Sequence, residues 1–169
     1  MSAPANLFRR HHFPGEIISH CVWLYFQFSL SYRDIELMMA ERGIVLTYEA
    51  VRDWCRKFGP YFASEVKRRN RSKVGSKWHL DGGVSQDHRQ HRYLNNRAEN
   101  SHQPTRQRER RMKKFKSPEQ AQWFLSTFDT VGSHFRMMRH RLSAERHRSL
   151  INAAFLVWNE IAGLAAVRS

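Results

Sequence analysis

The chain has 169 residues and carries 29 Lys and Arg against 15 Asp and Glu, a formal net charge of +14. With 41% hydrophobic and 12% aromatic residues, wholesale disorder is excluded. No apolar run reaches the roughly 18 residues that a membrane span needs, and residues 1–14 lack the apolar stretch of a signal peptide. Two distant cysteines indicate neither a disulfide framework nor a zinc site. We therefore expect a basic intracellular protein of one domain or two small ones.

Two helices are predicted first, within residues 16–43. The inward face of the first repeats with helical spacing at Ile17, Cys21, Leu24 and Phe28. Ser31 and Asp34 have the spacing of a capping box, which starts the second helix. Gly43 is expected to end it, because glycine enters the left-handed conformation at little cost.

A third helix is predicted from Thr47, its cap, to Phe58, before Gly59 and Pro60 break the chain. Its inward stripe is Val51, Trp54, Cys55 and Phe58. Because Cys21 and Cys55 both fall on apolar stripes, we interpret them as small buried hydrophobic residues.

Three short helices with a turn between the last two suggest a helix-turn-helix head, whose third helix enters the major groove of DNA. The outward residues of that helix are Glu49, Arg52, Asp53, Arg56 and Lys57. Among them Arg52, Arg56 and Lys57 are the candidates for DNA contact. The alternative is a plain three-helix bundle, whose surface would look similar.

The basic excess lies in the middle of the chain. Residues 59–116 hold 16 Lys and Arg against 5 acids, whereas residues 1–58 hold 7 against 6 and residues 117–169 hold 6 against 4. Such a field attracts polyanions, most simply the phosphates of nucleic acid. Lys67, Arg68 and Arg69 are the candidates here, and a solvated basic linker is the alternative for this stretch.

A short strand is predicted over 77–81, ending at Asp81, and a second one within 84–92. A helix from about residue 97 would carry Glu99, Arg106 and Arg110 along one side. Two further helices are expected over 117–162, capped by Ser117 and Ser143. Their inward residues are Ala121, Phe124, Leu125 and Phe128, then Leu150, Ala153, Ala154, Val157 and Ile161.

The most specific motif of the chain is the run Asn95-Asn96-Arg97-Ala98-Glu99-Asn100. It is accompanied by Arg10-His11-His12-Phe13-Pro14, by Ser31-Tyr32-Arg33-Asp34-Ile35-Glu36 and by Trp78-His79-Leu80-Asp81. Together these motifs resemble the DDE-class transposases of bacterial insertion sequences, most closely the insertion sequence six family.

The resemblance implies an RNase H-like catalytic domain whose three acids hold two Mg²⁺ ions for DNA cleavage and strand transfer. It assigns Asp81 and Glu99 as the first and third acids, and hence as metal ligands, and Arg106 as a contact to transposon-end DNA. It further implies binding to terminal inverted repeats, a role in DNA transposition and recombination, and a bacterial cytoplasmic, nucleoid-associated location.

The sequence departs from that pattern between the two acids. Only 99 − 81 = 18 positions separate Asp81 from Glu99, where the family has further strands, helices and the second Asp. Asp87 is the one acid between them, and its position does not suit that ligand. We therefore predict an internal deletion with its junction near 82–84. Two acids without a complete sheet lack the rigid placement that two-metal chemistry needs.

The predicted organisation is mainly α. A helix-turn-helix head at 1–60 is followed by a basic helical linker at 61–76, a remnant of the RNase H-like DDE domain at 77–116 with one or two short strands, and a helical part at 117–169. The expected function is that of a truncated transposase that binds transposon ends and has lost catalysis. The alternatives are a DNA-binding inhibitor that occupies transposon ends or pairs with an intact transposase, a Mg²⁺-dependent enzyme completed by a partner or in a homo-oligomer, and a decaying gene product with no selected function.

Overall fold

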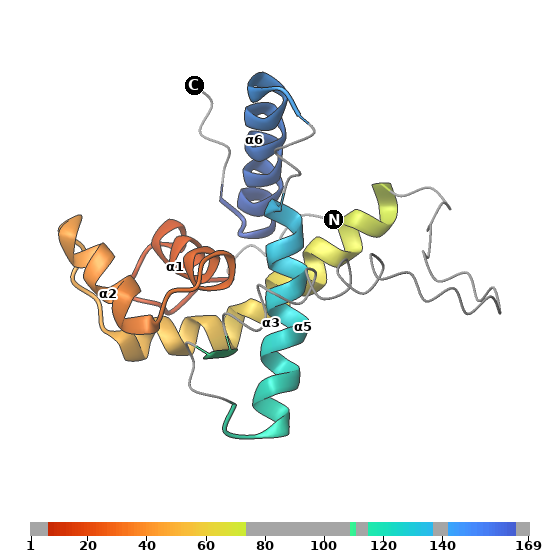
Figure 1. Cartoon of the computed structure of the whole chain (residues 1–169). Helices are drawn as coiled ribbons and strands as arrows, with labels where there is room; N and C mark the ends of the chain where they lie inside the picture. The colour runs from red at the N-terminus through yellow and green to blue at the C-terminus, as the bar shows by residue number, and fades with distance from the viewer. Residues whose placement is uncertain (1–6, 74–108, 111–114, 137–141, 165–169) are drawn as a thin grey trace.

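The computed structural model describes residues 7–73, 109–110, 115–136 and 142–164, and these residues are largely helical. The helices are α1 (Gly15–Gln27), α2 (Tyr32–Glu41), α3 (Tyr48–Lys73), α5 (Pro118–Phe135) and α6 (Ala144–Ile161) (Figure 1). Within the described ranges there is no strand. The mainly helical fold is thus confirmed there, whereas the strands predicted over 77–92 lie outside the described residues.

Helix starts follow the predicted caps. The Ser31 hydroxyl accepts from the Asp34 N–H at 3.1 Å, and the Asp34 carboxylate accepts from the Ser31 N–H at 2.7 Å, which completes the capping box. The side chains of Thr47, Ser117 and Ser143 each accept an N–H from three residues further on, at the starts of α3, α5 and α6. These caps satisfy N–H groups that the first helical turn cannot pair.

The predicted helix break at Gly59 and Pro60 is wrong, because both residues lie inside the 26-residue helix α3. Gly59 is needed where α3 meets its neighbours: a Cβ there would lie 2.7 Å from Cε2 of Phe26 and 3.2 Å from Cγ2 of Thr127. Pro60 faces solvent. Beyond Pro60 the buried stripe continues with Phe62. The free energy gained by burying such apolar side chains outweighs the local cost of Gly59 and Pro60 inside a helix.

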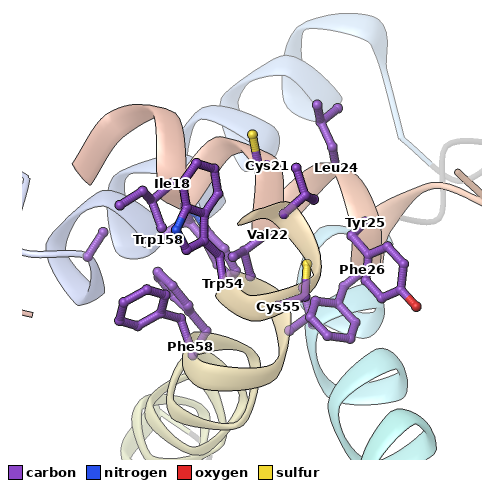
Figure 2. Close-up of a cluster of buried hydrophobic side chains, with 14 of the residues drawn as sticks. Ile18, Cys21, Val22, Leu24, Tyr25, Phe26, Trp54, Cys55, Phe58 and Trp158 are labelled. Atoms are coloured by element: carbon purple, nitrogen blue, oxygen red, sulfur yellow. The ribbon is translucent and has the colours of Figure 1, made fainter. Parts of the chain in front are cut away.

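One hydrophobic core joins the head to the C-terminal helices (Figure 2). Helix α1 contributes Phe26, which is fully buried against α3 and α5. Trp158 of α6 stacks on Phe62 of α3, with ring centroids 4.1 Å apart. Figure 1 shows α5 crossing α3, with α2 at the left beside the start of α3 and α6 above the crossing. None of the described helices has the length and hydropathy of a membrane span.

Three residues predicted to face inward do not. Phe28 is 45% exposed, Leu125 is 39% exposed and Ala153 is also exposed. The buried face of α6 instead centres on Trp158, which the sequence did not single out. Apolar residues occur on more than one side of these helices, so the choice of face depends on the neighbouring helix.

Candidate DNA-binding surface

The link between α2 and α3 is set by a left-handed glycine. Gly43 has φ +73°, and its N–H donates to the Ala40 carbonyl at 2.9 Å while the Ile44 N–H donates to the Met39 carbonyl at 2.9 Å. These bonds satisfy the last carbonyls of α2 and turn the chain back towards α3. Residues 42–47 form the whole connection, with the Leu46 side chain buried beneath it. Helices α2 and α3 pack on one another.

The first half of α3 has two distinct faces. Val51, Trp54, Cys55 and Phe58 are buried against the core, as predicted. The outward residues Asp53, Arg56 and Lys57 are exposed, and Glu49 and Arg52 are partly exposed. The sequence therefore placed the basic side chains correctly on the solvent side of this helix.

Acidic side chains moderate the charge of that face. Arg52 lies 3.5 Å from the Asp53 carboxylate, with 40% of its side chain exposed. A hydrogen bond from the Tyr48 side chain lowers the pKa of Glu49, so this carboxylate stays ionised at neutral pH. Three cations and two anions leave the outward face of α3 only weakly positive. Arg33 of α2 adds a cation beside the helix start, 4.9 Å from the centroid of the Tyr48 ring.

A residue that the sequence did not single out as a site residue lies against this face. The Nε2 atom of His11 is 2.9 Å from Nζ of Lys57, although the two are 46 positions apart. Burial, and then the nearby Lys57 charge, lower the pKa of His11 below its ordinary value of 6.5. No pattern within residues 9–12 fixes which side chain of α3 they meet. The only sequence signal was the high density of His and Arg there.

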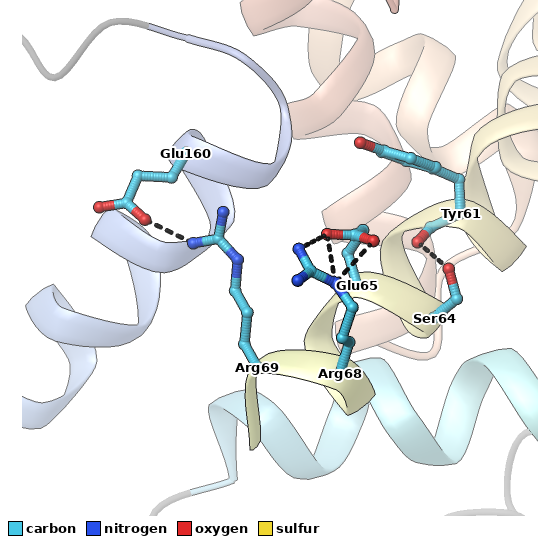
Figure 3. Close-up of polar contacts among 6 residues, drawn as sticks. All are labelled: Tyr61, Ser64, Glu65, Arg68, Arg69 and Glu160. Atoms are coloured by element: carbon cyan, nitrogen blue, oxygen red, sulfur yellow. Dashed lines mark hydrogen bonds and ion pairs between the residues drawn. The ribbon is translucent and has the colours of Figure 1, made fainter. Parts of the chain in front are cut away.

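The basic residues near the C-terminal end of α3 that were predicted to contact phosphate have different side-chain partners (Figure 3). Arg68 donates to both carboxylate oxygens of Glu65, at 2.7 to 3.3 Å, and this hydrogen bond lowers the pKa of Glu65. Arg69 pairs with Glu160 of α6, and only 23% of its side chain is exposed. Lys67 points to solvent. The three cations are therefore not equivalent, and Arg69 links two helices of the fold.

The predicted catalytic residues Asp81 and Glu99 and the DNA contact Arg106 lie outside the described residues. Arg110 is described, and it is exposed in a short helical stretch. Among the described residues, no three His, Cys, Asp or Glu side chains come together as metal ligands would.

Both cysteines are buried, which confirms their predicted structural role. Burial raises the pKa of the Cys21 thiol to about 12. A thiol held protonated at neutral pH is a poor nucleophile and a poor metal ligand. Neither chemistry is therefore expected from Cys21.

Comparison with known proteins finds a family match for the middle of the chain. Residues 79–138 match the family described as a DDE domain. This match supports the resemblance of the chain to DDE-class transposases of the insertion sequence six family. Of the matched residues, the structure describes 109–110 and 115–136. No solved structure matches the chain.

Two relatives illustrate this relationship. The transposase for insertion sequence-like element IS431mec of Staphylococcus aureus strain N315 is 32% identical over 76 residues, which are 45% of this chain and 34% of the relative. The transposase for insertion sequence element IS257 in transposon Tn4003 of Staphylococcus aureus is 30% identical over 76 residues, with the same shares. The match thus spans about one third of the length of these transposases. The resemblance that the sequence motifs suggested is confirmed.

Proposed function

We propose that this chain is an insertion-sequence protein that binds the terminal inverted repeats of its element through α2 and α3. The observation that carries the proposal is the pairing of these helices with outward basic residues on α3, in a chain related to transposases. Helix α3 enters the major groove as the recognition helix. Arg52 and Arg56 contact base edges, where an arginine fork matches the acceptors of guanine. Lys57 contacts the backbone.

The other basic residues supply phosphate contacts that carry no sequence information. They are Lys67, Arg68, Arg69, Arg106 and Arg110. Arg68 and Arg69 must exchange a carboxylate partner for a phosphate, whereas Lys67 is exposed. Lys67 is therefore the strongest single contributor to non-specific binding among the three on α3.

We propose further that strand-transfer activity is lost through the internal deletion. Asp81 and Glu99 would be the carboxylates that hold Mg²⁺, which in an intact site activates the attacking oxygen and stabilises the leaving one. The 18-residue separation leaves no room for the intervening strands and second Asp of an RNase H-like domain. What remains of the DDE region is a remnant that follows the head, and the DDE match over 79–138 extends through α5.

Two further roles follow from the same DNA-binding head. A chain that occupies transposon ends without cutting them would inhibit an intact transposase, directly or by pairing with it. Alternatively, an intact transposase as partner would supply the missing acid and restore Mg²⁺-dependent strand transfer, whereas a homo-oligomer would need an acid other than the lost Asp to do so. The retention of both Asp81 and Glu99 favours testing this second role.

The DNA-binding proposal is tested with terminal-repeat duplex and random duplex of equal length, by fluorescence anisotropy. The double variant Arg52→Gln and Arg56→Gln should weaken binding to terminal-repeat DNA more than binding to random DNA, by about tenfold or more for each arginine that reads a base. The control, Arg146→Gln with Arg148→Gln, removes the same charge from exposed positions on α6. Equal weakening on both duplexes would refute base reading by α3.

A further inference from the structure

The segment before α1 is anchored on α3 by two aromatic side chains. Phe8 packs edge-to-face on Phe58 with ring centroids 5.0 Å apart, and Phe13 packs in the same way on Trp54 at 5.4 Å. A Cβ on Gly15 would lie 2.4 Å from the Phe8 ring, so the segment also lies tightly against the start of α1. Residues 9–12 are thereby held in a turn beside the exposed edge of α3.

The turn is closed by an unusual backbone conformation. Arg10 has φ +69°, which costs a non-glycine residue on the order of 1 kcal/mol. The His11 N–H donates to the Phe8 carbonyl at 3.1 Å across the turn. This geometry leaves the side chains of Arg9, Arg10 and His12 exposed. Strained backbone held by its surroundings is a recurrent feature of binding sites.

The turn also brings a ring nitrogen of His11 onto the ammonium of Lys57. A lysine ammonium is only a donor, so Nε2 of His11 accepts from it at 2.9 Å and the ring is neutral. The His11 ring packs edge-to-face on Phe58 with centroids 5.2 Å apart, and Lys57 Nζ lies 5.2 Å from the same ring. The His11 imidazole and the Lys57 ammonium thus meet over the Phe58 ring, and no acidic side chain takes part in these contacts.

We propose that His11 and Lys57 together bind a phosphodiester of the DNA backbone, with His11 protonated in the complex. The inference rests on the proposed DNA binding and adds a contact outside the two-helix motif. A phosphate oxygen can accept from both nitrogens at once and remove the repulsion between two adjacent cations. Arg9 and Arg10 lie next to the site along the chain and extend the positive edge towards the same backbone.

Proton uptake follows from the charges that surround His11. In the free protein burial, and then Lys57, lower the pKa of His11. Arg9 and Arg10 precede His11 in the chain, and Arg56 precedes Lys57. Among the other titratable groups, His12 follows His11 in the segment, and Asp53 lies one helical turn before Lys57 on α3; both are exposed. A bound phosphate raises the pKa of His11 above its free value. Affinity for DNA should therefore rise as the pH falls through the raised pKa, and level off below the free pKa.

The test measures affinity for the terminal-repeat duplex from pH 5.5 to 8.5 for the wild type and for His11→Gln, which cannot be protonated. The wild type should gain up to about tenfold in affinity per pH unit over the sensitive range. His11→Gln should not show that gain. The salt dependence of binding should also become shallower by about one unit of slope at low pH in this variant. The matched control is His12→Gln, an exposed neighbour that contacts Phe13 and should keep the wild-type profile.

A second measurement follows the His11 imidazole directly by NMR, with duplex DNA and with inorganic phosphate. A raised pKa with DNA supports the proposal. A raised pKa with inorganic phosphate but not with DNA assigns the site to a free anion and overturns it, as does no change with either. If the wild type does not bind duplex DNA, the proposed function fails. If it binds but His11→Gln has the wild-type pH profile, only this inference fails.

Discussion

A single methyl group added at Gly59 tests the packing that holds α3 against α1 and α5. The new Cβ would lie 2.7 and 2.9 Å from two atoms of the Phe26 ring and 3.2 Å from Cγ2 of Thr127. The Phe26 ring is fully buried and touches Tyr25, Trp123 and Phe124, so it cannot swing away. The helices must therefore separate slightly, or the ring must leave its preferred rotamer.

The magnitude combines two opposing effects. Overpacking a dense core costs about 1–3 kcal/mol, whereas replacing a helical glycine by alanine contributes about 1 kcal/mol of stability. Gly59→Ala should therefore destabilise the fold by about 1 kcal/mol. Gly132→Ala is the matched control: its Cβ would meet only a flexible Arg136 nitrogen at 3.5 Å, so that variant should gain about 1 kcal/mol.

The assay is thermal and urea unfolding of both variants, followed by circular dichroism. A difference of about 2 kcal/mol between them corresponds to about 4–8 °C in Tm for a chain of this size. A Gly59→Ala variant as stable as Gly132→Ala would refute the close approach of α3 to Phe26. It would also mean that the space beside Phe26 does not require a glycine at position 59.

Three further outcomes are expected. Ser31→Ala removes the cap of α2 and should cost about 1 kcal/mol of unfolding free energy, measured by urea titration. Asp81→Asn and Glu99→Gln should leave Mg²⁺-dependent cleavage of terminal-repeat DNA at the level of the no-protein control, as in the wild type; wild-type cleavage that both variants abolish would instead favour an enzyme. Arg69→Met should lower stability by less than about 1 kcal/mol, because its pair with Glu160 is largely exposed on the acid side. That decrease should shrink in high salt, and a decrease unaffected by salt would assign Arg69 a packing role.

The continuous helix α3 connects the proposed DNA-binding residues to the C-terminal helices. Its first half carries Arg52 and Arg56, and its second half packs through Phe62 on Trp158 of α6. The proposed recognition helix is therefore part of the same core as the C-terminal helices. Mutations at that distant contact should change the stability of the proposed DNA-binding head as well.

The features that the sequence determined by itself are local. The caps at Ser31, Thr47, Ser117 and Ser143 were predictable because each rests on a hydrogen bond to a residue three positions away. The left-handed Gly43 follows from the same kind of short-range geometry. The outward basic face of α3 was also predictable, because helical periodicity fixes which side chains lie opposite the apolar stripe.

Only the tertiary structure decided which elements meet. The sequence suggested a break at Gly59, but this glycine lies inside a helix, where it allows close packing on Phe26. The apolar stripe that continues past Gly59 was the sequence signal for an unbroken helix. The inward face of α6 was settled by the stacking of Trp158 on α3. The contact of His11 with Lys57 joins residues 46 positions apart. Such pairings depend on how whole helices pack, and neither periodicity nor local propensity determines that.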